Sequence, residues 1–547
     1  MKKALSLILA LVMVFALVAC GGDKADDSAK PSQSTAPAPS ASSKPGEMSQ
    51  TNQGTGEVVE ESDRILKLPM VALLGNVDPA FVSSIDGQSL VWQVYEGLIK
   101  YDEKTGEVYP RVAKDWAFAA DNSYIEFNIN PEVTFHNGEK VTADDVVYSY
   151  DRFKELKRFG RNIDVFTSWE KIDDDTVRFY LSGTSSNPLL YMSEILIMNK
   201  ANAEAAGDNA FMTPETSIGT GPFYFTELDF DGKMVAMPYE NYFRGRANIG
   251  GIEWTYLTDA STALAAFQMG DFDFAKLPTA NVKEMEATGK YNVLRAGSTH
   301  NSFIGINYEK IQDVNVRQAI LYALDNNAIM QAAYDGLGIV SHNLAETGMI
   351  AGGYSFDDYY NYNPEKAKEC LKAAGYTDDE IKAGIPIGNI VAMSTNYYAK
   401  VAAIVQQMLA QVGLKAEVTT FEQATVEDLW YRRAPGSEDM ALVCHGDNIK
   451  IDTAHFFANY INAREEGREK WEKWGLAGPW QEVGEAAAAE FDEAKRNDLW
   501  VDFWTQLKDQ AIYYSLFHRD NTYIATTDLN IVWGVNYYHI YDWSWNK

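Results

Sequence analysis

The side chains that most often do chemistry in enzymes and metal sites are sparse in this chain. Only three cysteines and seven histidines occur among its 547 residues. The densest group is the run Cys444-His445-Gly446-Asp447, which offers a thiol, an imidazole and a carboxylate. Zinc sites need three or four fixed ligands, so this run alone does not predict a metal centre.

Sequence patterns that mark catalytic sites are also absent. The chain has no Gly-x-Ser-x-Gly elbow, no His-Glu-x-x-His pair, no phosphate-binding Walker loop and no paired-glycine nucleotide fingerprint. Asp173-Asp174-Asp175 precedes an alternating strand and is typical of a solvated turn, not of a calcium loop. We therefore expect a protein that is not an enzyme and that carries no cofactor and no metal.

Cys20 stands apart because of the residues before it. Two lysines are followed by an almost wholly apolar run at 4–19, which ends in Leu17-Val18-Ala19-Cys20. The run has the length of a secretory signal and is short for a membrane span. Its end resembles the bacterial lipobox, in which the cysteine is the first mature residue and carries lipid. We predict a lipoprotein signal peptide at 1–19 and lipidation at Cys20; the alternative is an ordinary signal peptide with an incidental cysteine.

Residues 20–63 have the composition of a tether. Ser, Ala, Pro, Gly, Thr, Asp and Gln dominate, with almost no large apolar side chain. Such a stretch cannot bury enough surface to offset its ordering entropy. We expect a disordered tether between a lipid anchor and a folded part.

The rest of the chain has a globular composition. The sequence is 46% hydrophobic and 13% aromatic, and its formal charge of −30 argues against nucleic acid as a partner. About 485 residues follow the tether, which is more than one ordinary core accommodates. We therefore expect two or more lobes.

Elements that would position functional residues differ between the two halves. The first half is strand-rich, with alternating segments at 124–129 and 176–181. In the second half, a buried strand at 390–394, a helix with an apolar stripe over 401–412 and a strand at 414–421 predict a parallel α/β crossover. Asn363 and Pro364 are typical of a helix start, and Cys370 falls on the apolar face of that helix. The sequence does not decide whether Cys370 and Cys444 form a disulfide.

Six blocks along the chain carry a family resemblance. The chain resembles the bacterial family 5 extracellular solute-binding proteins, the oligopeptide- and dipeptide-binding components of ABC importers. The blocks are "VDPAF" at 77–81, "VYEGLIKYDEKTGEVYPRVAKDW" at 94–116, "VTFHNGEKVTADDVVYSYDRF" at 133–153, "GTGPFYF" at 219–225, "VNVRQAILYALDNNAIM" at 314–330 and "YNPEKAKECLKAAGY" at 362–376. They occur in the family order.

The resemblance implies a periplasmic-binding-protein-like α/β fold of type II. Two lobes would be joined by a hinge that the chain crosses twice, near "STHNSFIGIN" and "QAIYYSLFH", with an extra subdomain inserted in lobe one. Lobe one would comprise residues 64–296 plus 514–547, and lobe two residues 297–513. His136, within one of the blocks, would be structural.

The resemblance also places the ligand between the lobes. It points to the first strand turn, the hinge and the loops of lobe two. An aromatic side chain beside arginines could stack on a solute and bind its carboxylate; core packing is the alternative for Trp430, and one of the two neighbouring arginines is expected at the surface. The candidate ligand-binding residues are Phe81, Ser83, His300, Asn301, Phe303, Trp430, Arg432, Arg433, His445, Asp447 and Asp452.

One departure from the family leaves the ligand class open. Peptide-binding members carry an aspartate that holds the peptide ammonium, and Ile449 occupies that position here. Asp447 and Asp452 are the nearby carboxylates that could replace it. The family also takes up nickel chelates, oligosaccharides, haem and opine-like solutes.

We therefore expect a lipid-anchored monomer on the outer face of the cell membrane. It would capture a peptide or peptide-like small solute and deliver it to the permease subunits of an ABC importer and their ATPases. The alternatives are a binder of a non-peptide solute or a receptor feeding a sensor, and, least favoured, a secreted hydrolase.

Overall fold

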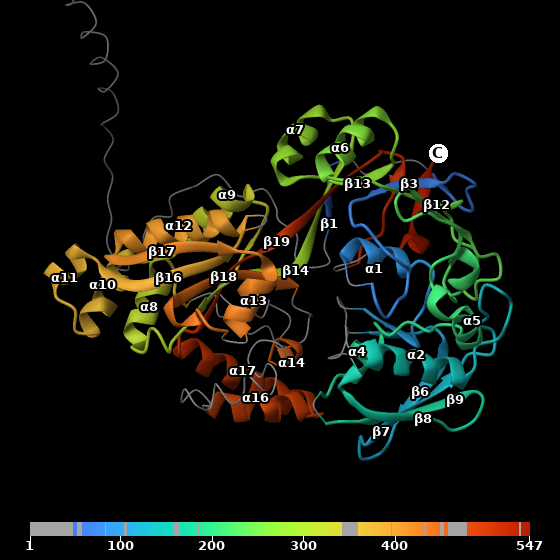
Figure 1. Cartoon of the computed structure of the whole chain (residues 1–547), viewed down its shortest axis with the longest axis horizontal. Coiled ribbons are helices and arrows are strands. Elements are labelled where there is room, and N and C mark those ends of the chain that lie inside the picture. Colours follow the sequence, from blue (N-terminus) through green and yellow to red (C-terminus); the bar gives the residue numbers. More distant parts are fainter. Residues whose placement is uncertain are drawn as a thin grey trace, which may run out of the picture. The chain divides into compact units, whose positions relative to one another are not determined.

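Two long neighbouring strands organise the computed structural model of the chain. β14 (Asn292–Ile306) and β19 (Tyr513–Ala525) run antiparallel within a sheet of order β13-β19-β14-β18-β16-β17 (Figure 1). β1 (Met48–Gln50) pairs with β14, and β15 (Gly338–Val340) pairs with β19. The described residues belong to one compact unit. They are 48–51, 57–82, 84–102, 107–156, 163–183, 185–341, 359–394, 397–431, 434–448, 453–457, 479–534 and 538–547.

The first half of the chain builds two four-stranded sheets. One has the order β10-β11-β12-β3, and the other, β6-β7-β9-β8, is antiparallel throughout. The alternating segments predicted at 124–129 and 176–181 are confirmed as neighbouring strands β7 and β9. The strands are β3 (Leu66–Met70), β4 (Ile99–Tyr101), β5 (Val108–Pro110), β6 (Ala113–Phe118), β7 (Tyr124–Ile129), β8 (Phe166–Lys171), β9 (Thr176–Leu181), β10 (Phe223–Leu228), β11 (Lys233–Pro238), β12 (Ile252–Tyr256) and β13 (Phe274–Lys276).

Short helices connect these strands. α2 begins directly after Thr142, and the Asp145 carboxylate accepts hydrogen bonds from the backbone N–H and the hydroxyl of Thr142, at 2.9 and 2.8 Å. The helices of this half are α1 (Ile85–Val91), α2 (Ala143–Leu156), α4 (Pro188–Met192), α5 (Lys200–Ala206), α6 (Ala260–Met269) and α7 (Val282–Thr288).

The second half contains the predicted parallel crossover. β16 (Ile385–Met393) pairs in parallel with both β17 (Leu414–Phe421) and β18 (Met440–Asn448), and α12 (Tyr398–Gln411) connects β16 to β17. Its other elements are α8 (Val314–Tyr322), α9 (Asn326–Tyr334), β15 (Gly338–Val340), α10 (Pro364–Ala373), α11 (Asp378–Ala383), α13 (Gln423–Tyr431), α14 (Thr453–Phe456), α16 (Pro479–Ala489) and α17 (Glu493–Asp509).

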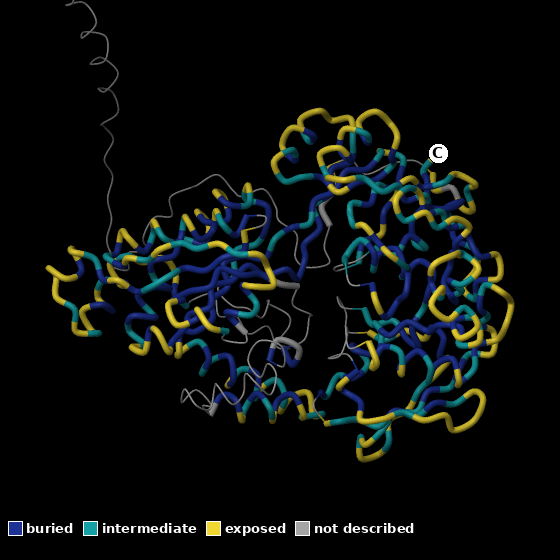
Figure 2. Tube along the Cα trace, in the orientation of Figure 1, coloured by how far each residue is buried: buried dark blue, intermediate teal, exposed yellow. Residues whose placement is uncertain are grey.

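Apolar residues form separate clusters on the two sides of the hinge strands. One cluster runs from Phe303 to Phe517, and a second combines residues 66–254 with parts of β13, β14, β19 and the C-terminal segment. Buried residues follow the sheet strands in both regions, and exposed residues gather on outer helices and turns (Figure 2). This arrangement is the two-lobed α/β fold that the sequence predicts.

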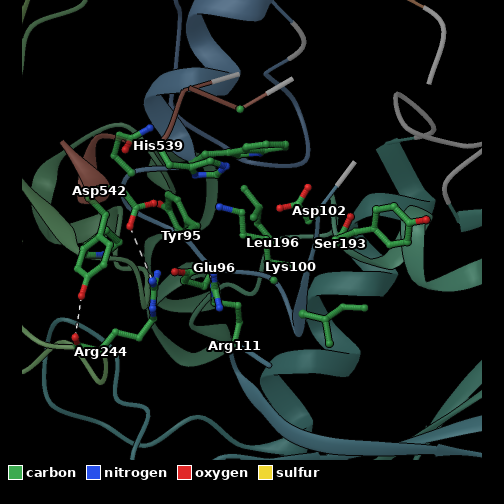
Figure 3. A pocket seen from close by; sticks show the side chains of 18 of the residues that line it. Tyr95, Glu96, Lys100, Asp102, Arg111, Ser193, Leu196, Arg244, His539 and Asp542 are labelled. Atoms are coloured by element: carbon green, nitrogen blue, oxygen red, sulfur yellow. Dashed lines mark hydrogen bonds and ion pairs between the residues drawn. The ribbon is translucent and has the colours of Figure 1, made fainter. Parts of the chain in front are cut away.

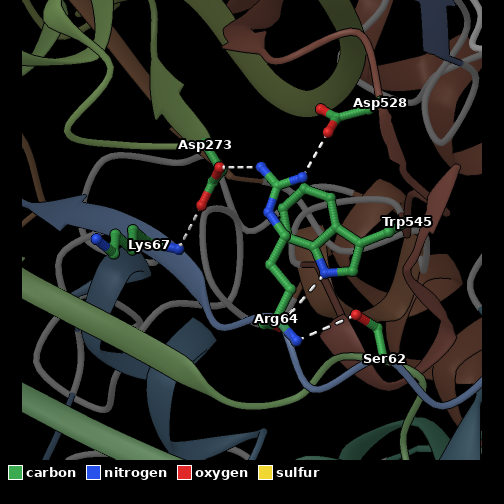
Figure 4. Close-up of polar contacts among 6 residues, drawn as sticks. All are labelled: Ser62, Arg64, Lys67, Asp273, Asp528 and Trp545. Carbon is green, nitrogen blue, oxygen red and sulfur yellow. Dashed lines mark hydrogen bonds and ion pairs between the residues drawn. The ribbon is translucent and has the colours of Figure 1, made fainter. Parts of the chain in front are cut away.

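The C-terminal segment packs against the start of the folded part. The Arg64 guanidinium bonds Asp273 at 2.7 Å and also Asp528, and it lies 3.5 Å from the centre of the Trp545 ring (Figure 4). β2 (Val58–Val59) and β20 (Leu529–Asn530) both pair with β21 (Ser544–Asn546). Residues almost five hundred positions apart are thereby joined. β2 lies inside the stretch 20–63 that the sequence predicts as a disordered tether, so strand structure is present in the last part of that stretch, and the lobe boundaries stay a prediction.

Several local expectations are confirmed. The Asn363 side chain caps α10, with Pro364 at its first position. Cys370 and Cys444 are both buried and free, so they do not form a disulfide with each other. Asp173, Asp174 and Asp175 lie in an exposed turn. None of the helices in the described ranges is both long and apolar enough to cross a bilayer.

Candidate functional site

The hinge strands bring several predicted site residues together. The Asn301 amide on β14 donates to the Ser515 hydroxyl at 2.9 Å and to Nε2 of His518 at 2.8 Å, both on β19. Asn301 is fully buried, as is Ser515. Strand register places Asp447 of β18 opposite Asn301 on the other side. Three strands therefore meet at Asn301.

His300 and His445 lie beside this network. Nε2 of His300 is 3.2 Å from the Tyr398 hydroxyl at the start of α12. Burial, together with the nearby Arg519 charge, holds the pKa of His300 well below its usual value, and burial lowers the pKa of His445 to about 4. Both imidazoles are neutral near pH 7, so they can serve as hydrogen-bonding groups and not as fixed charges.

A bulge interrupts the pairing of the hinge strands at this point. Gly297 pairs with Asp520 and Asn301 with His518, so three residues of β14 face Arg519 alone. The Ser298 hydroxyl donates to the Arg519 carbonyl at 2.7 Å. Bulges bend a strand and redirect its side chains, and they are frequent beside binding sites.

Phe81 presents an exposed aromatic ring from the first strand turn. Its side chain is 43% exposed. The turn is fixed by Asp78, which accepts the backbone N–H of Ala80 at 2.9 Å and pairs with Arg152 at 2.5 Å. Phe81 can therefore offer stacking surface from a rigid base.

Phe303 and Trp430 lie in the core of lobe two. They are 0% and 3% exposed, and each ring contacts that of Tyr513. The indole fills the space above Gly305, where an added Cβ would stand 2.3 Å from the ring. Core packing thus accounts for Trp430, and a contact of either residue with solute stays a prediction.

The remaining predicted site residues are not placed by the structure. Cys20, Ser83, Arg432, Arg433 and Asp452 lie outside the described residues, and for Asp447 only the strand register is described.

A cavity of about 350 Å³ lies elsewhere in lobe one. Its lining comes from the 92–111 region, the 193–196 segment, Pro222, Tyr242, Arg244 and the C-terminal segment, and none of the predicted site residues lines it. Trp92 stacks on His539 with ring centres 5.3 Å apart. Glu96 accepts from the Tyr242 hydroxyl. The Glu96 carboxylate also lies 3.5 Å from the Arg111 guanidinium, and both residues line the cavity (Figure 3). The negative charge of Glu96 and the positive charge of Arg111 therefore compensate each other within the cavity.

His136 is structural, as the sequence predicts. Its Nδ1 accepts the Gly219 N–H at 3.2 Å, so its Nε2–H donates to the Gly221 carbonyl at 3.0 Å. Burial lowers its pKa to about 4. Within the described ranges, no group of three His, Cys, Asp or Glu side chains could hold a metal ion.

Sequence reasoning missed Arg519, which lies in the middle of the hinge. The signal was a single arginine within "YYSLFHRDNTYIA", a strand otherwise dominated by apolar, aromatic and small polar residues. Within the described residues, the hinge strands offer buried hydrogen-bonding groups, the Arg519 guanidinium and aromatic surface, which suit the binding of a polar solute.

Comparison with known proteins identifies the family. Residues 107–465, more than half of the chain, match the model of the bacterial extracellular solute-binding proteins, family 5 (middle region). The dipeptide-binding protein of Escherichia coli K12 is 27% identical over 76% of this chain and 82% of its own length. Heme-binding protein A of Haemophilus influenzae is 29% identical over 61% of this chain and 65% of its own length. The structure of NikA from Brucella suis in complex with Fe(III)-EDTA superposes with a TM-score of 0.76 at 19% identity, covering 88% of this chain and 99% of that one.

Proposed function

The chain belongs to the bacterial extracellular solute-binding proteins of family 5, and on that premise we propose that it captures a peptide or peptide-like solute for an ABC importer. The solute would be enclosed between lobe one, residues 64–296 plus 514–547, and lobe two, residues 297–513. Permease subunits and their ATPases would then receive it from the closed form.

The observation that carries this proposal is the double crossing made by β14 and β19. β14 contributes Leu294 and Ala296 to the apolar cluster of lobe one, but Phe303, Ile304 and Ile306 to that of lobe two. β19 does the same in reverse, with Phe517 in lobe two and Tyr523 in lobe one. Two adjacent strands that join two cores favour a hinge motion in which the lobes close on a ligand.

A peptide is the solute class that the relatives favour. The dipeptide-binding relative aligns over more of this chain than the heme-binding relative does. Ile449 at the usual ammonium-binding position requires that another group neutralise a peptide ammonium, and Asp447 and Asp452 are the nearest carboxylates along the chain. We propose Asp447 for that role, because its strand register places it beside Asn301 at the hinge.

The remaining ligand contacts follow from the hinge and the loops around it. We propose that His300, Asn301 and His445 hydrogen-bond the solute as the lobes close, and that Phe81 stacks on it. Ser83, Arg432 and Arg433 are proposed as further contacts from the first strand turn and a lobe-two loop.

We also propose that the protein is a monomer without enzymatic activity, tethered to the outer face of the cell membrane by lipid on Cys20. The support is the lipobox-like end of the apolar run at 4–19 and the tether composition of 20–63.

The experiment that tests the function is mass spectrometry of the small molecules released when the purified protein is denatured. Recovery of peptides, followed by calorimetric binding of the synthetic peptides, is the expected result. Recovery of a non-peptide solute that rebinds would replace the peptide by that class. A released substrate that the pure protein converts would contradict the proposed lack of catalysis.

A further inference from the structure

Arg519 is a cation at the hinge without an ionic partner in the described structure. Its Nε atom is buried and makes no hydrogen bond, and no described carboxylate forms an ion pair with its guanidinium. The backbone is fixed on both sides: its carbonyl accepts from Ser298, and Gly338 of β15 pairs with it. A guanidinium removed from water without a partner is costly, so the position needs an explanation.

Other arginines in this chain show how a structural guanidinium is satisfied. Arg317 donates to three backbone carbonyls, those of Gln510, Ile311 and Gln312, at 2.7 to 2.9 Å. Arg295, on the neighbouring strand, pairs with Glu286 at 2.6 Å. Among the described residues, neither a set of backbone carbonyls nor a carboxylate pairs with the Arg519 guanidinium, which sets it apart from these two arginines.

The groups around Arg519 are neutral or positive. The Tyr334 hydroxyl hydrogen-bonds the guanidinium, and Tyr397, Tyr398 and Tyr523 lie close enough to interact with its charge. His300, whose imidazole is neutral, lies near it as well. The Tyr334 hydroxyl donates its own proton to the Asp520 carbonyl at 3.1 Å, so it accepts from the guanidinium and does not neutralise the charge. A buried guanidinium that no described carboxylate neutralises suits an anion, which can bind it through charge-assisted hydrogen bonds.

A second cation and a small cavity adjoin this position. Asn521 and Tyr523, which follow Arg519 on β19, line a cavity of about 40 Å³ together with the exposed Lys276 of β13. Asp86 lines the same cavity but makes no ion pair with Lys276 among the described contacts. Asp520 is the next residue along β19, and strand alternation directs it to the opposite face from Arg519.

We infer that Arg519 is the anion subsite of the solute-binding site and takes a carboxylate of the captured solute; this rests on the proposed function. The assignment deepens that function by naming the charge that the solute presents to the hinge. Tyr397 and Tyr398 belong to the lobe-two core, whereas Tyr523 belongs to that of lobe one. A carboxylate held at Arg519 therefore contacts both lobes and favours closure over the open form.

The test compares peptides that differ only in terminal charge. A set of di- and tripeptides with free carboxyl termini and the same set with carboxamide termini are titrated into the full chain, its Arg519→Met and Arg519→Lys variants, and the control Arg295→Gln. The parent and the control should prefer the acids at least tenfold in Kd. Arg519→Met should lose this preference, and Arg519→Lys should keep part of it.

Two results with these peptides overturn the inference. Equal affinity of the parent for acids and amides does so while leaving peptide binding intact, and so does an unchanged preference in Arg519→Met. Amidated peptides that contain glutamate keep a side-chain carboxylate but lack the terminal one. Their affinity therefore shows which of the two carboxylates Arg519 binds.

If the parent binds neither peptide set, the peptide proposal fails and the co-purified solute decides the role of Arg519. An anionic solute that the parent retains and Arg519→Met lacks supports the inference. A neutral or cationic solute, or an anionic one that Arg519→Met retains, overturns it.

Melting temperatures measured without ligand distinguish a binding role of Arg519 from a purely structural one. Arg519→Met should melt at or above the parent because it removes an unpaired cation, whereas Arg295→Gln should melt lower. A drop of several degrees in Arg519→Met would mean that the arginine serves the fold, and the inference would be rejected.

Discussion

Asp520, next to the hinge arginine, is a buried carboxyl with an unusual ionisation. It is 1% exposed, and its Oδ2 has no hydrogen-bond partner. Burial raises its pKa to about 6, although the charge of Arg295 acts in the opposite direction. A carboxyl that binds its proton more tightly in the fold than in the unfolded chain stabilises the fold at acid pH, and this contribution is lost as pH rises from about 4 through 6.

Replacing Asp520 by Asn should therefore stabilise the protein at neutral pH. The free energy of unfolding should rise by about 1–3 kcal/mol at pH 7.5 and by about half as much at pH 5. Urea denaturation at the two pH values measures this. The exposed Asp271→Asn serves as control and should change little at either pH; a loss of stability in Asp520→Asn at pH 7.5 would show that the carboxylate has a partner.

The role proposed for Asp447 has its own test. If it holds a solute ammonium, Asp447→Asn removes one partner of a desolvated ion pair, which typically costs about 3–5 kcal/mol. Calorimetry with the identified solute should then show binding weakened by two decades or more, and Asp452→Asn should affect thermal stability more than affinity. Binding within a few-fold of the parent would mean that this carboxylate does not hold the solute.

At the scale of elements, the loop at 219–222 connects two other segments of the first lobe through hydrogen bonds. The Gly221 N–H donates to the Val94 carbonyl at 2.8 Å, the Phe223 N–H donates to the Gln93 carbonyl at 3.1 Å, and His136 bonds both glycines from the other side. A Cβ on Gly219 would stand 2.1 Å from the Val94 carbonyl oxygen. The glycines in this family block are thus required by close backbone approach and not by turn conformation alone.

Gly219→Ala should consequently destabilise the protein by about 3 kcal/mol or more, because overpacking adds to broken hydrogen bonds. The matched control is Gly75→Ala, where a Cβ would meet nothing within 4 Å and the change should stay within about 0.5 kcal/mol. Thermal and chemical denaturation of both variants decide the comparison. Equal stability of the two would imply that the loop can move away from Val94.

At the scale of the whole molecule, the two lobes also touch away from the hinge strands. The Ser186 N–H in lobe one donates to the Ala488 carbonyl of α16 in lobe two at 2.7 Å, and the rings of Phe118 and Phe491 meet edge to face at 6.5 Å. A hinge motion has to make and break these contacts.

We expect the bound solute to close the lobes. Small-angle scattering should give a smaller radius of gyration with saturating solute than without it. The double variant Ser186→Cys/Ala488→Cys, when oxidised, should release solute at least tenfold more slowly than when reduced, and neither single variant should respond. An unchanged scattering profile at confirmed saturation would indicate a rigid site.

The lipid anchor is a further prediction for the whole chain. Cys20→Ala should move the protein from the membrane fraction to the medium, because the segment 20–63 offers almost no large apolar side chain to hold it there. Fractionation of expressing cells with an immunoblot measures this. Retention of the variant at the membrane would contradict attachment through Cys20.

The sequence by itself determined the elements whose signals are local. Asn363 and Pro364 mark the start of α10, the stripe of Trp500, Phe503, Trp504 and Leu507 marks the buried face of α17, and β16, α12 and β17 follow from periodicity. Capping and periodicity act between residues a few positions apart, so they are readable without the fold. The family resemblance came from blocks of this same kind, each spanning one or two elements.

Only the tertiary structure decided which side chains meet at the hinge. Asn301 bonds residues more than two hundred positions away, and a bulge sets which of them it reaches. The sequence left Trp430 between core and site because an indole suits both, and the structure shows that the ring is buried and packs over Gly305. Arg519 shows the same limit, since a missing ionic partner is a property of everything that packs around a residue and not of its neighbours along the chain.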